Sequence, residues 1–358
     1  MSSGNVQEEW QYSQEFARAC AELPAESPQS VVAFKFGGSS LLGAKRMFHA
    51  AGLVREAAKT SRVVVVVSAM KGVTDKLLNL ARLTESGDHA EANRQAGALL
   101  RIHADVLSEL QLAERDRQRV WHDLRLLGSD LLHTCGGDYI SPSPSCSGDF
   151  TSPSFLEQSH ALHDSLASFG ERFCARLFAA ALDKSGVPAV PVTSSEFVLT
   201  CDTFRDAQPH MEETRRRGRD LLLPLLESGL VPVVTGFLGA TNDGRVTTLG
   251  RNSSDFSGAI IAHVVDADEL VIWTDVDGIY TIYTENPNES AEAKLLHELS
   301  YDEAHALAAA GAKVLHAKVL PLAAETEMVV WVRNTFNPAF RGTKIGPAIE
   351  GKLQRGDA

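Results

Sequence analysis

Cysteine is scarce and scattered in this chain, which has five cysteines among 358 residues. They are Cys20, Cys135, Cys146, Cys174 and Cys201, and no two of them have the C-x-x-C spacing of a zinc or redox motif. An odd number of widely spaced cysteines is typical of a protein kept in a reducing compartment. The sequence therefore predicts such a compartment and no zinc site.

Long apolar runs and an excess of positive charge are also missing. The run in "RVVVVVSAM" is too short to span a bilayer, and the first thirty residues lack the basic start and apolar centre of a secretory signal. The formal net charge of −12 argues against nucleic acid or an anionic membrane surface as the main partner. These absences predict a cytoplasmic protein.

The apolar content of 44% and charged content of 22% are ordinary for a globular protein. Strand-like segments, expected at 31–36, 63–68, 229–235, 269–273 and 328–332, alternate with helical spacing. Helices are expected at 44–58, from about 74, within 88–134, over 159–184, and near 301–310 and 314–325. A continuous β-branched run such as 63–68 indicates a parallel strand covered on both faces. The alternation predicts an α/β fold with a mainly parallel sheet sandwiched between helices.

Composition also suggests the boundaries of the folded part. Residues 1–30 have the character of an extension, 31–346 of one folded domain, and 347–358 of a tail. Within the domain, residues 134–154 are rich in serine, proline and glycine, which is typical of a surface loop.

The stretch "KFGGSS" places Lys35 at the end of the first expected strand, with Gly37 and Gly38 directly after it. A glycine pair lets backbone N–H groups approach a polyanion because no Cβ intervenes, and a lysine beside the pair can bind the same phosphate oxygens. The order differs from the Walker and G-x-G-x-x-G motifs, since the lysine comes first. A tight turn with a solvated lysine is the alternative, and the stretch alone does not decide.

Two further stretches carry polar groups that have both a structural and a functional interpretation. In "VVSAMKGVTD", Ser68 and Thr74 either cap the next helix or bind a ligand at the carboxyl end of the strands. In "SFGERFCARL", the helical neighbours of Glu171 are small: Ala167, Ser168, Cys174 and Ala175. These small neighbours leave space beside the Glu171 carboxylate, which can then bind an ammonium group. The alternative is that Glu171 is a surface residue paired with an arginine.

The segment "GFLGATNDGRVTTLGRNSSDFSGA" predicts a hairpin at "NDG", followed by a helix with Ser253 or Ser254 as N-cap and Asp255 in its first turn. A helix N-terminus binds anions through its free N–H groups. Arg251 adds a guanidinium fork suited to a carboxylate or phosphate, so we favour anion binding over packing here.

In "ELVIWTDVDGIYT", Thr274 and Asp275 stand where a strand ends. Asp277 and Tyr280 follow closely. The two acidic residues, Asp275 and Asp277, can bind a ribose or a hydrated magnesium ion, or they form an Asx turn. Lys313 follows a glycine near an expected helix start and is either a phosphate contact or an exposed lysine.

In this order, these stretches, together with "LSYDEAHALAAAGAKVLH" and "VRNTFNP…GTKI", closely resemble the catalytic domain of aspartate kinases, in the amino acid kinase family. The resemblance covers about residues 31 to 345. It implies a three-layer αβα sandwich around a mainly parallel eight-stranded sheet, the carbamate kinase-like fold. It also implies transfer of the γ-phosphoryl group of ATP to the side-chain carboxylate of L-aspartate. Mg²⁺ would be carried by the nucleotide without a metal site of the protein's own, and a homodimer is left open.

The resemblance also implies roles for individual residues. Those assigned to ATP are Lys35, Gly37, Gly38, Ser39, Thr274, Asp275, Tyr280, Lys313 and Val314. Those assigned to aspartate are Ser68, Thr74, Glu171, Arg251, Asn252, Ser253 and Ser254, and the catalytic pair is Lys35 and Asp255. A carboxylate nucleophile, with a free pKa of about 4, needs no general base, so catalysis consists of positioning two anions and neutralising their charge.

The chain departs from the family pattern at several points. Asn252 and Ser253 replace two glycines after the arginine, Asn288 stands where an arginine is usual, and "VLHAK" replaces "VLHP". The chain ends soon after "GTKI", where tandem ACT regulatory domains normally begin. The expectation is an enzyme without an ACT domain and without built-in feedback inhibition by lysine or threonine.

Two alternatives stay open. One is a kinase for another acid, such as glutamate or an N-acylated amino acid, although an acylated amine offers no ammonium to Glu171. The other is a catalytically weak regulatory paralogue, suggested by Asn288 and the altered glycine pair. The second alternative is disfavoured by the presence of Lys35, Glu171, Arg251, Asp255 and Asp275.

Overall fold

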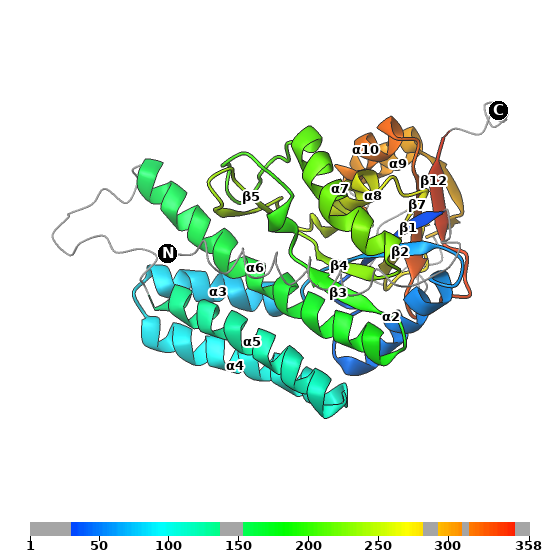
Figure 1. Cartoon of the computed structure of the whole chain (residues 1–358). Coiled ribbons are helices and arrows are strands. Elements are labelled where there is room, and N and C mark those ends of the chain that lie inside the picture. Colours follow the sequence, from blue (N-terminus) through cyan, green and yellow to red (C-terminus); the bar gives the residue numbers. More distant parts are fainter. Residues whose placement is uncertain (1–29, 137–152, 282–292, 310–314, 348–358) are drawn as a thin grey trace.

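A twisted eight-stranded sheet runs through the centre of the chain, as the computed structural model shows for residues 30–136, 153–281, 293–309 and 315–347 (Figure 1). The strand order is β10-β12-β11-β7-β1-β2-β4-β3. Their bounds are β1 Val31–Phe36, β2 Arg62–Val67, β3 Ala189–Val192, β4 Val231–Thr235, β7 Glu269–Thr274, β10 Glu298–Ser300, β11 Val329–Asn334 and β12 Thr343–Gly346. Only the β11–β12 pair is antiparallel among these neighbours. The predicted mainly parallel sheet is confirmed.

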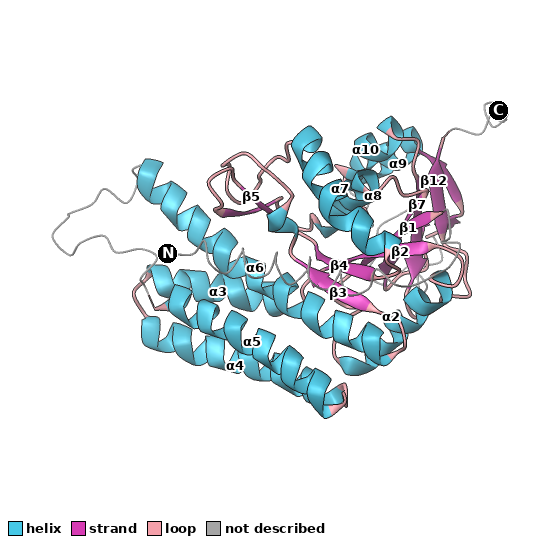
Figure 2. Cartoon of the chain, in the orientation of Figure 1, coloured by secondary structure: helices cyan, strands magenta, loops and turns pink. Residues whose placement is uncertain are grey.

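Helices cover both faces of the sheet (Figure 2). Their bounds are α2 Ala44–Ala57, α3 Val73–Glu85, α4 His89–Glu109, α5 Glu114–Cys135, α6 Pro153–Lys184, α7 Met211–Glu227, α8 Ser254–Val264, α9 Tyr301–Ala309 and α10 Val319–Glu325. Helices α2, α3 and α6 lie on one face of the sheet, and α4 and α5 pack outside α3 and α6. Helices α7, α8 and α10 lie on the other face. Within the described ranges, no helix is both long and apolar enough to cross a membrane.

The continuous apolar runs of β1 and β2 follow from their position between these layers. Phe34 and Phe36 join the core under α2 and α6, whereas Ala33 joins the core under α7 and α8. In β2, alternate valines divide in the same way, with Val65 on the first side and Val66 on the other. Because successive side chains of a strand point to opposite faces, a central strand needs apolar residues at every position.

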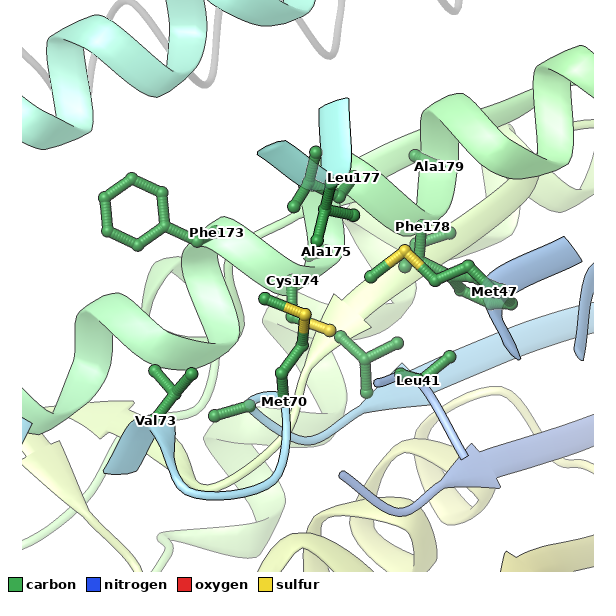
Figure 3. Packing of buried hydrophobic residues seen from close by; sticks show 14 of the residues in the cluster. Leu41, Met47, Met70, Val73, Phe173, Cys174, Ala175, Leu177, Phe178 and Ala179 are labelled. Atoms are coloured by element: carbon green, nitrogen blue, oxygen red, sulfur yellow. The ribbon is translucent and has the colours of Figure 1, made fainter. Parts of the chain in front are cut away.

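Figure 3 shows the core beneath α6, where Met47, Met70 and Cys174 fill the space between the helix and the strand ends. This packing fixes the long helix α6 against the carboxyl ends of β1 and β2. The position of any polar side chain on that face of α6 is therefore set by the core.

Short elements escaped prediction. The strand β3 has only four residues and contains Pro191, and β12 is equally short; such segments carry little periodicity. Helix α7 was also not predicted, and α6 begins at Pro153, six residues before the predicted start. The short hairpins β5 (Leu238–Ala240) with β6 (Val246–Thr248), and β8 (Ile279–Tyr280) with β9 (Leu295–Leu296), complete the described strands. The first of them confirms the hairpin predicted at "NDG".

The predicted domain limits stay predictions. Helix α5 extends to Cys135, so the first two residues of the predicted insertion 134–154 are helical. Most of that insertion, the N-terminal extension and all but the first residue of the tail lie outside the described residues.

Candidate active site

A cavity of about 490 Å³ opens where the carboxyl ends of β1, β2 and β7 meet. Parallel strands that end side by side leave their following loops at one edge, which is where open α/β sheets bind ligands. The predicted residues that line the cavity are Lys35, Gly37, Gly38, Ser39, Ser68, Thr74, Glu171, Arg251, Asn252, Ser254, Asp255, Thr274 and Asp275. Residues from sequence positions more than two hundred apart are thus brought into one site.

Lys35 is buried, with 8% of its surface exposed, and its Nζ lies 2.7 Å from Oδ1 of Asp255. Asp255 belongs to the first turn of α8, so the ion pair ties that helix to the end of β1. The alternative of a solvated lysine in a turn is excluded by this burial. A buried charge pair at the cavity wall keeps a cation in place before any ligand arrives.

The two glycines after β1 have different roles in the structure. A Cβ on Gly38 would lie 2.4 Å from the carbonyl oxygen of Ala69, so the loops after β1 and β2 can approach each other only with glycine there. The N–H of Gly37 donates to the carbonyl of Trp273 at 3.2 Å. Within the described residues, the N–H groups of Gly38 and Ser39 have no acceptor. An anion at this corner would therefore be bound by Gly38 and Ser39, rather than by the Gly37 amide.

Glu171 is buried on α6, with 3% of its surface exposed. Its Oε1 accepts a hydrogen bond from the N–H of Ala69 at 3.0 Å, and its Oε2 is buried without a partner among the described residues. Burial raises the pKa of this carboxyl to about 8. The alternative of a surface glutamate paired with an arginine is excluded, and the free oxygen leaves room for a donor from a ligand.

Neither Ser68 nor Thr74 caps a helix. The N-cap of α3 is Gly72, which has φ of 82° and no side chain to offer, and Thr74 is the second residue of the helix. Ser68 follows β2 and its N–H donates to the carbonyl of Phe36. With the capping interpretation excluded, the two hydroxyl groups stand in the cavity wall.

The turn after β6 brings Arg251 to the cavity mouth, where its side chain is exposed. Asn252 has φ of 61°, a left-handed conformation that asparagine tolerates better than most residues. Asparagine can thus replace glycine here without breaking the turn. Ser253 is the N-cap of α8, makes no side-chain capping bond and is fully buried outside the cavity lining.

The residues predicted to bind the nucleotide do not all line the cavity. Thr274 and Asp275 line the cavity, and the Thr274 hydroxyl lies 3.3 Å from Asp275 Oδ1. Tyr280 is buried in β8 and is not in the cavity lining. Lys313, Val314 and Asn288 lie outside the described residues, so their predicted roles stay predictions.

Sequence reasoning missed several residues of the cavity wall. Lys71, Gly72 and Asp75 belong to the loop and first turn after β2, and Phe237 follows β4. Lys71 lies within the "SAMKG" stretch, where its position between a strand end and a helix start was a usable signal. The sequence carries no signal for Phe237, because its place in the cavity wall depends on a left-handed φ of 70° that the sequence does not reveal.

Asp164 of α6 holds two segments outside the cavity lining. Its Oδ2 accepts the N–H groups of Arg205 and Thr248, both at 2.8 Å, and its Oδ1 accepts the Thr248 hydroxyl at 2.8 Å. Burial is the main cause that raises its pKa to about 6. One side chain thus joins α6, which carries Glu171, to β6, which leads to Arg251.

Two carboxylates in the cavity wall, Asp255 and Asp275, are the candidate ligands for a metal ion. Within the described ranges, no group of three His, Cys, Asp or Glu residues lies close enough to hold an ion. Mg²⁺ commonly binds through one or two carboxylates together with substrate phosphates. Asp275 at the end of β7 and Asp255 near Lys35 supply that number, which fits an ion that enters with a nucleotide.

Known proteins are similar to this chain over most of its length. The model of the amino acid kinase family matches residues 30–334. The chain belongs to the amino acid kinase family. The lysine-sensitive aspartokinase 3 of Escherichia coli is 33% identical over 88% of this chain, and the chloroplastic aspartokinase 3 of Arabidopsis thaliana is 33% identical over 87%. The chain spans 64% and 52% of the lengths of these two relatives.

A solved structure of E. coli aspartokinase III in complex with aspartate and ADP has a TM-score of 0.74 and 31% identity to this chain. The match covers 90% of this chain and 66% of that one. The predicted fold class and the predicted resemblance to aspartate kinases are both confirmed.

Proposed function

We propose that this amino acid kinase family member is an aspartate kinase, which transfers the γ-phosphoryl group of ATP to the side-chain carboxylate of L-aspartate and gives 4-phospho-L-aspartate. The observation that carries the proposal is the pairing, in one cavity, of a phosphate corner at Lys35 and Gly38 with the unpartnered buried oxygen of Glu171. The similarity to aspartokinases supports it.

The amino acid would be bound by its two charged α-groups. Its ammonium would donate to Oε2 of Glu171, which completes the hydrogen bonding of a buried carboxylate. Its α-carboxylate would lie against the Arg251 fork, near the N-terminus of α8. Ser68 and Thr74 supply hydroxyl groups on the same wall.

The nucleotide would place its phosphates at the corner of the cavity formed by Lys35, Gly38 and Ser39. The N–H groups of Gly38 and Ser39 have no acceptor among the described residues, and Asp255 holds the Lys35 ammonium in position. Lys71 adds a further cation to the cavity wall. Thr274 and Asp275 would contact the nucleotide from the end of β7.

Repulsion between the two anionic substrates is the obstacle that these residues remove. The acceptor carboxylate is ionised at neutral pH, so no residue has to accept its proton. Fixed cations and amides instead neutralise charge on the transferred group, while Glu171 and Arg251 hold the acceptor in line. Mg²⁺ bound to the nucleotide would supply further neutralisation of the phosphate oxygens.

The proposal is tested by trapping the acyl phosphate with hydroxylamine in the presence of ATP. L-aspartate should give a hydroxamate, whereas L-glutamate and N-acetyl-L-aspartate should give little. A hydroxamate from glutamate alone would identify a different substrate. No product from any acid, although ATP binds, would favour the regulatory paralogue. A cytoplasmic location and a homodimer stay predictions.

A further inference from the structure

A second hollow, of about 360 Å³, lies between α4, α5 and α6, and it shares no lining residue with the active-site cavity. Its apolar walls are formed by Leu100, Ala104, Trp121, Leu124, Leu132 and Phe173. Trp121 is 42% exposed and Leu132 is 37% exposed, which is unusual for side chains of that size. Its size and apolar lining are those of a small-molecule site.

One polar group in this hollow lacks the partner that burial demands. His103 is 1% exposed, and its Nδ1 lies 2.8 Å from the carbonyl oxygen of Leu99. A carbonyl only accepts, so Nδ1 carries the hydrogen and Nε2 has a bare lone pair. Nε2 is buried and has no partner among the described residues. Burial also lowers the pKa of His103 to about 4, so the ring is neutral at pH 7.

The surroundings of His103 explain why nothing in the protein satisfies Nε2. Its ring lies 4.6 Å from the ring of Phe173, centroid to centroid, and apolar side chains make up most of the remaining wall. Phe173 is fully buried in the core beneath α6, but its ring points away from Met70 and Cys174 (Figure 3) and also lines the hollow. A donor from a ligand would restore a hydrogen bond that the free protein lacks.

Two arginines at the mouth of the hollow add a charge requirement. Arg101 on α4 and Arg125 on α5 line it, are exposed, and form no ion pair within the described residues. Other arginines of these helices, such as Arg94 and Arg117, pair with glutamates one turn away. Two unpaired guanidinium groups beside an apolar hollow suit an anionic group.

We propose that this hollow binds a small amphipathic acid: an aromatic or branched apolar body, one N–H or O–H group that donates to His103 Nε2, and an anionic group at Arg101 and Arg125. The three requirements come from three separate observations, namely the apolar walls, the unpartnered nitrogen and the unpaired arginines. The site is separate from the catalytic cavity and does not depend on the proposed aspartate kinase activity.

The probe 2-(p-toluidino)naphthalene-6-sulfonate has an aromatic body, one N–H and a sulfonate, and its fluorescence rises in apolar surroundings. We expect saturable binding with one molecule per chain, unchanged by saturating ADP. Ser129→Trp, an exposed substitution at the rim, should block binding. His103→Leu keeps the apolar volume and should weaken binding about tenfold through loss of one hydrogen bond. Arg125→Gln should also weaken binding, whereas Arg115→Gln, at an exposed position of the same helix outside the hollow, should not.

Unfolding by urea would confirm that each variant is folded. Binding that survives Ser129→Trp, or that is equal in His103→Leu and wild type, would overturn the proposal. If sedimentation showed that the chain self-associates and that association excludes the probe, the hollow would be an interface between copies, which would also overturn it.

Discussion

Lys35 and Glu171 are both buried ionisable groups in the wall of the same cavity, but only Lys35 forms an ion pair. Asp255 lies 2.7 Å from the Lys35 ammonium, whereas Glu171 receives one amide N–H and keeps one oxygen unpartnered. Burial without compensation destabilises a carboxylate, which is why the pKa of Glu171 rises to about 8. The protein thus accepts a local loss of stability at a position suited to an ammonium group.

This raised pKa gives a prediction about pH. In the free protein Glu171 is largely protonated at pH 7, so a ligand ammonium that requires the carboxylate must expel a proton. Calorimetric titration with L-aspartate in two buffers of different ionisation enthalpy should show proton release near pH 7 in wild type and none in Glu171→Gln. The variant should also bind aspartate about ten- to a hundredfold more weakly, through loss of a charge-assisted hydrogen bond.

Glu171→Gln, which should weaken aspartate binding, should also raise the stability of the fold at high pH. Because the folded-state pKa lies above the unfolded value, native Glu171 holds a proton that the unfolded chain loses, and stability falls as pH rises from about 4.5 to about 8. Glu171→Gln should therefore unfold at higher urea than wild type at pH 8.5, with the exposed Glu109→Gln as control. In the calorimetric titration with L-aspartate, equal proton release by wild type and Glu171→Gln would show that Glu171 does not bind the ammonium.

The Lys35 side chain supplies the second prediction at this scale. Lys35→Met keeps the packing of the stem against Gly258 but removes the charge that we propose faces the phosphates. Turnover should fall about a hundred- to a thousandfold, as for other losses of a group that stabilises transition-state charge. Lys45→Met, at an exposed position on α2, is the matched control. Near-normal turnover in folded Lys35→Met would show that Lys35 does not stabilise charge in the transition state.

At the scale of elements, the site depends on how closely the loops after β1 and β2 approach. The N–H of Lys71 donates to the carbonyl of Gly38 at 3.1 Å, and a Cβ on Gly38 would lie 2.4 Å from the Ala69 carbonyl. A Cβ on Gly37 would lie 3.7 Å from its nearest neighbour, the carbonyl oxygen of Trp273, which is an ordinary van der Waals contact. The two glycines of one motif therefore differ in their tolerance of a methyl group.

We expect Gly38→Ala to lower the free energy of unfolding by about 2 kcal/mol or more, because the backbone of one loop must move. Gly37→Ala should change it by less than about 0.5 kcal/mol. Urea denaturation of both variants measures the difference. Equal losses would mean that the close approach of the two loops does not require glycine at position 38.

The sequence predicted the long elements except α7, and it predicted the residues next to strand ends, for physical reasons that these residues illustrate. Lys35, Glu171 and Asp275 stand in recognisable patterns, where a buried strand or a helical face fixes the direction of the side chain. Short elements such as β3 and β12 were missed because four residues carry too little periodicity. Phe237 was missed because its position depends on a left-handed backbone angle, and Ser253 was expected in the site although it is buried beneath it.

On the scale of the whole molecule, the net charge of −12 conceals a local cluster of cations. Lys35, Lys71 and Arg251 line one cavity. The parallel neighbours β1 and β2 place Lys35 and Lys71 at the same edge of the sheet, and Arg251 reaches the cavity from the turn between β6 and α8. An acidic protein can bind two anions at once because the position of its charges, rather than their sum, sets the local potential.

A crystal structure of the chain with ADP and L-aspartate tests this account most directly. We predict the β-phosphate within hydrogen-bond distance of Lys35 Nζ and the Gly38 amide, and the aspartate ammonium on Oε2 of Glu171. A nucleotide whose phosphates lay away from that lysine–glycine corner, or an ammonium bound elsewhere, would contradict the account.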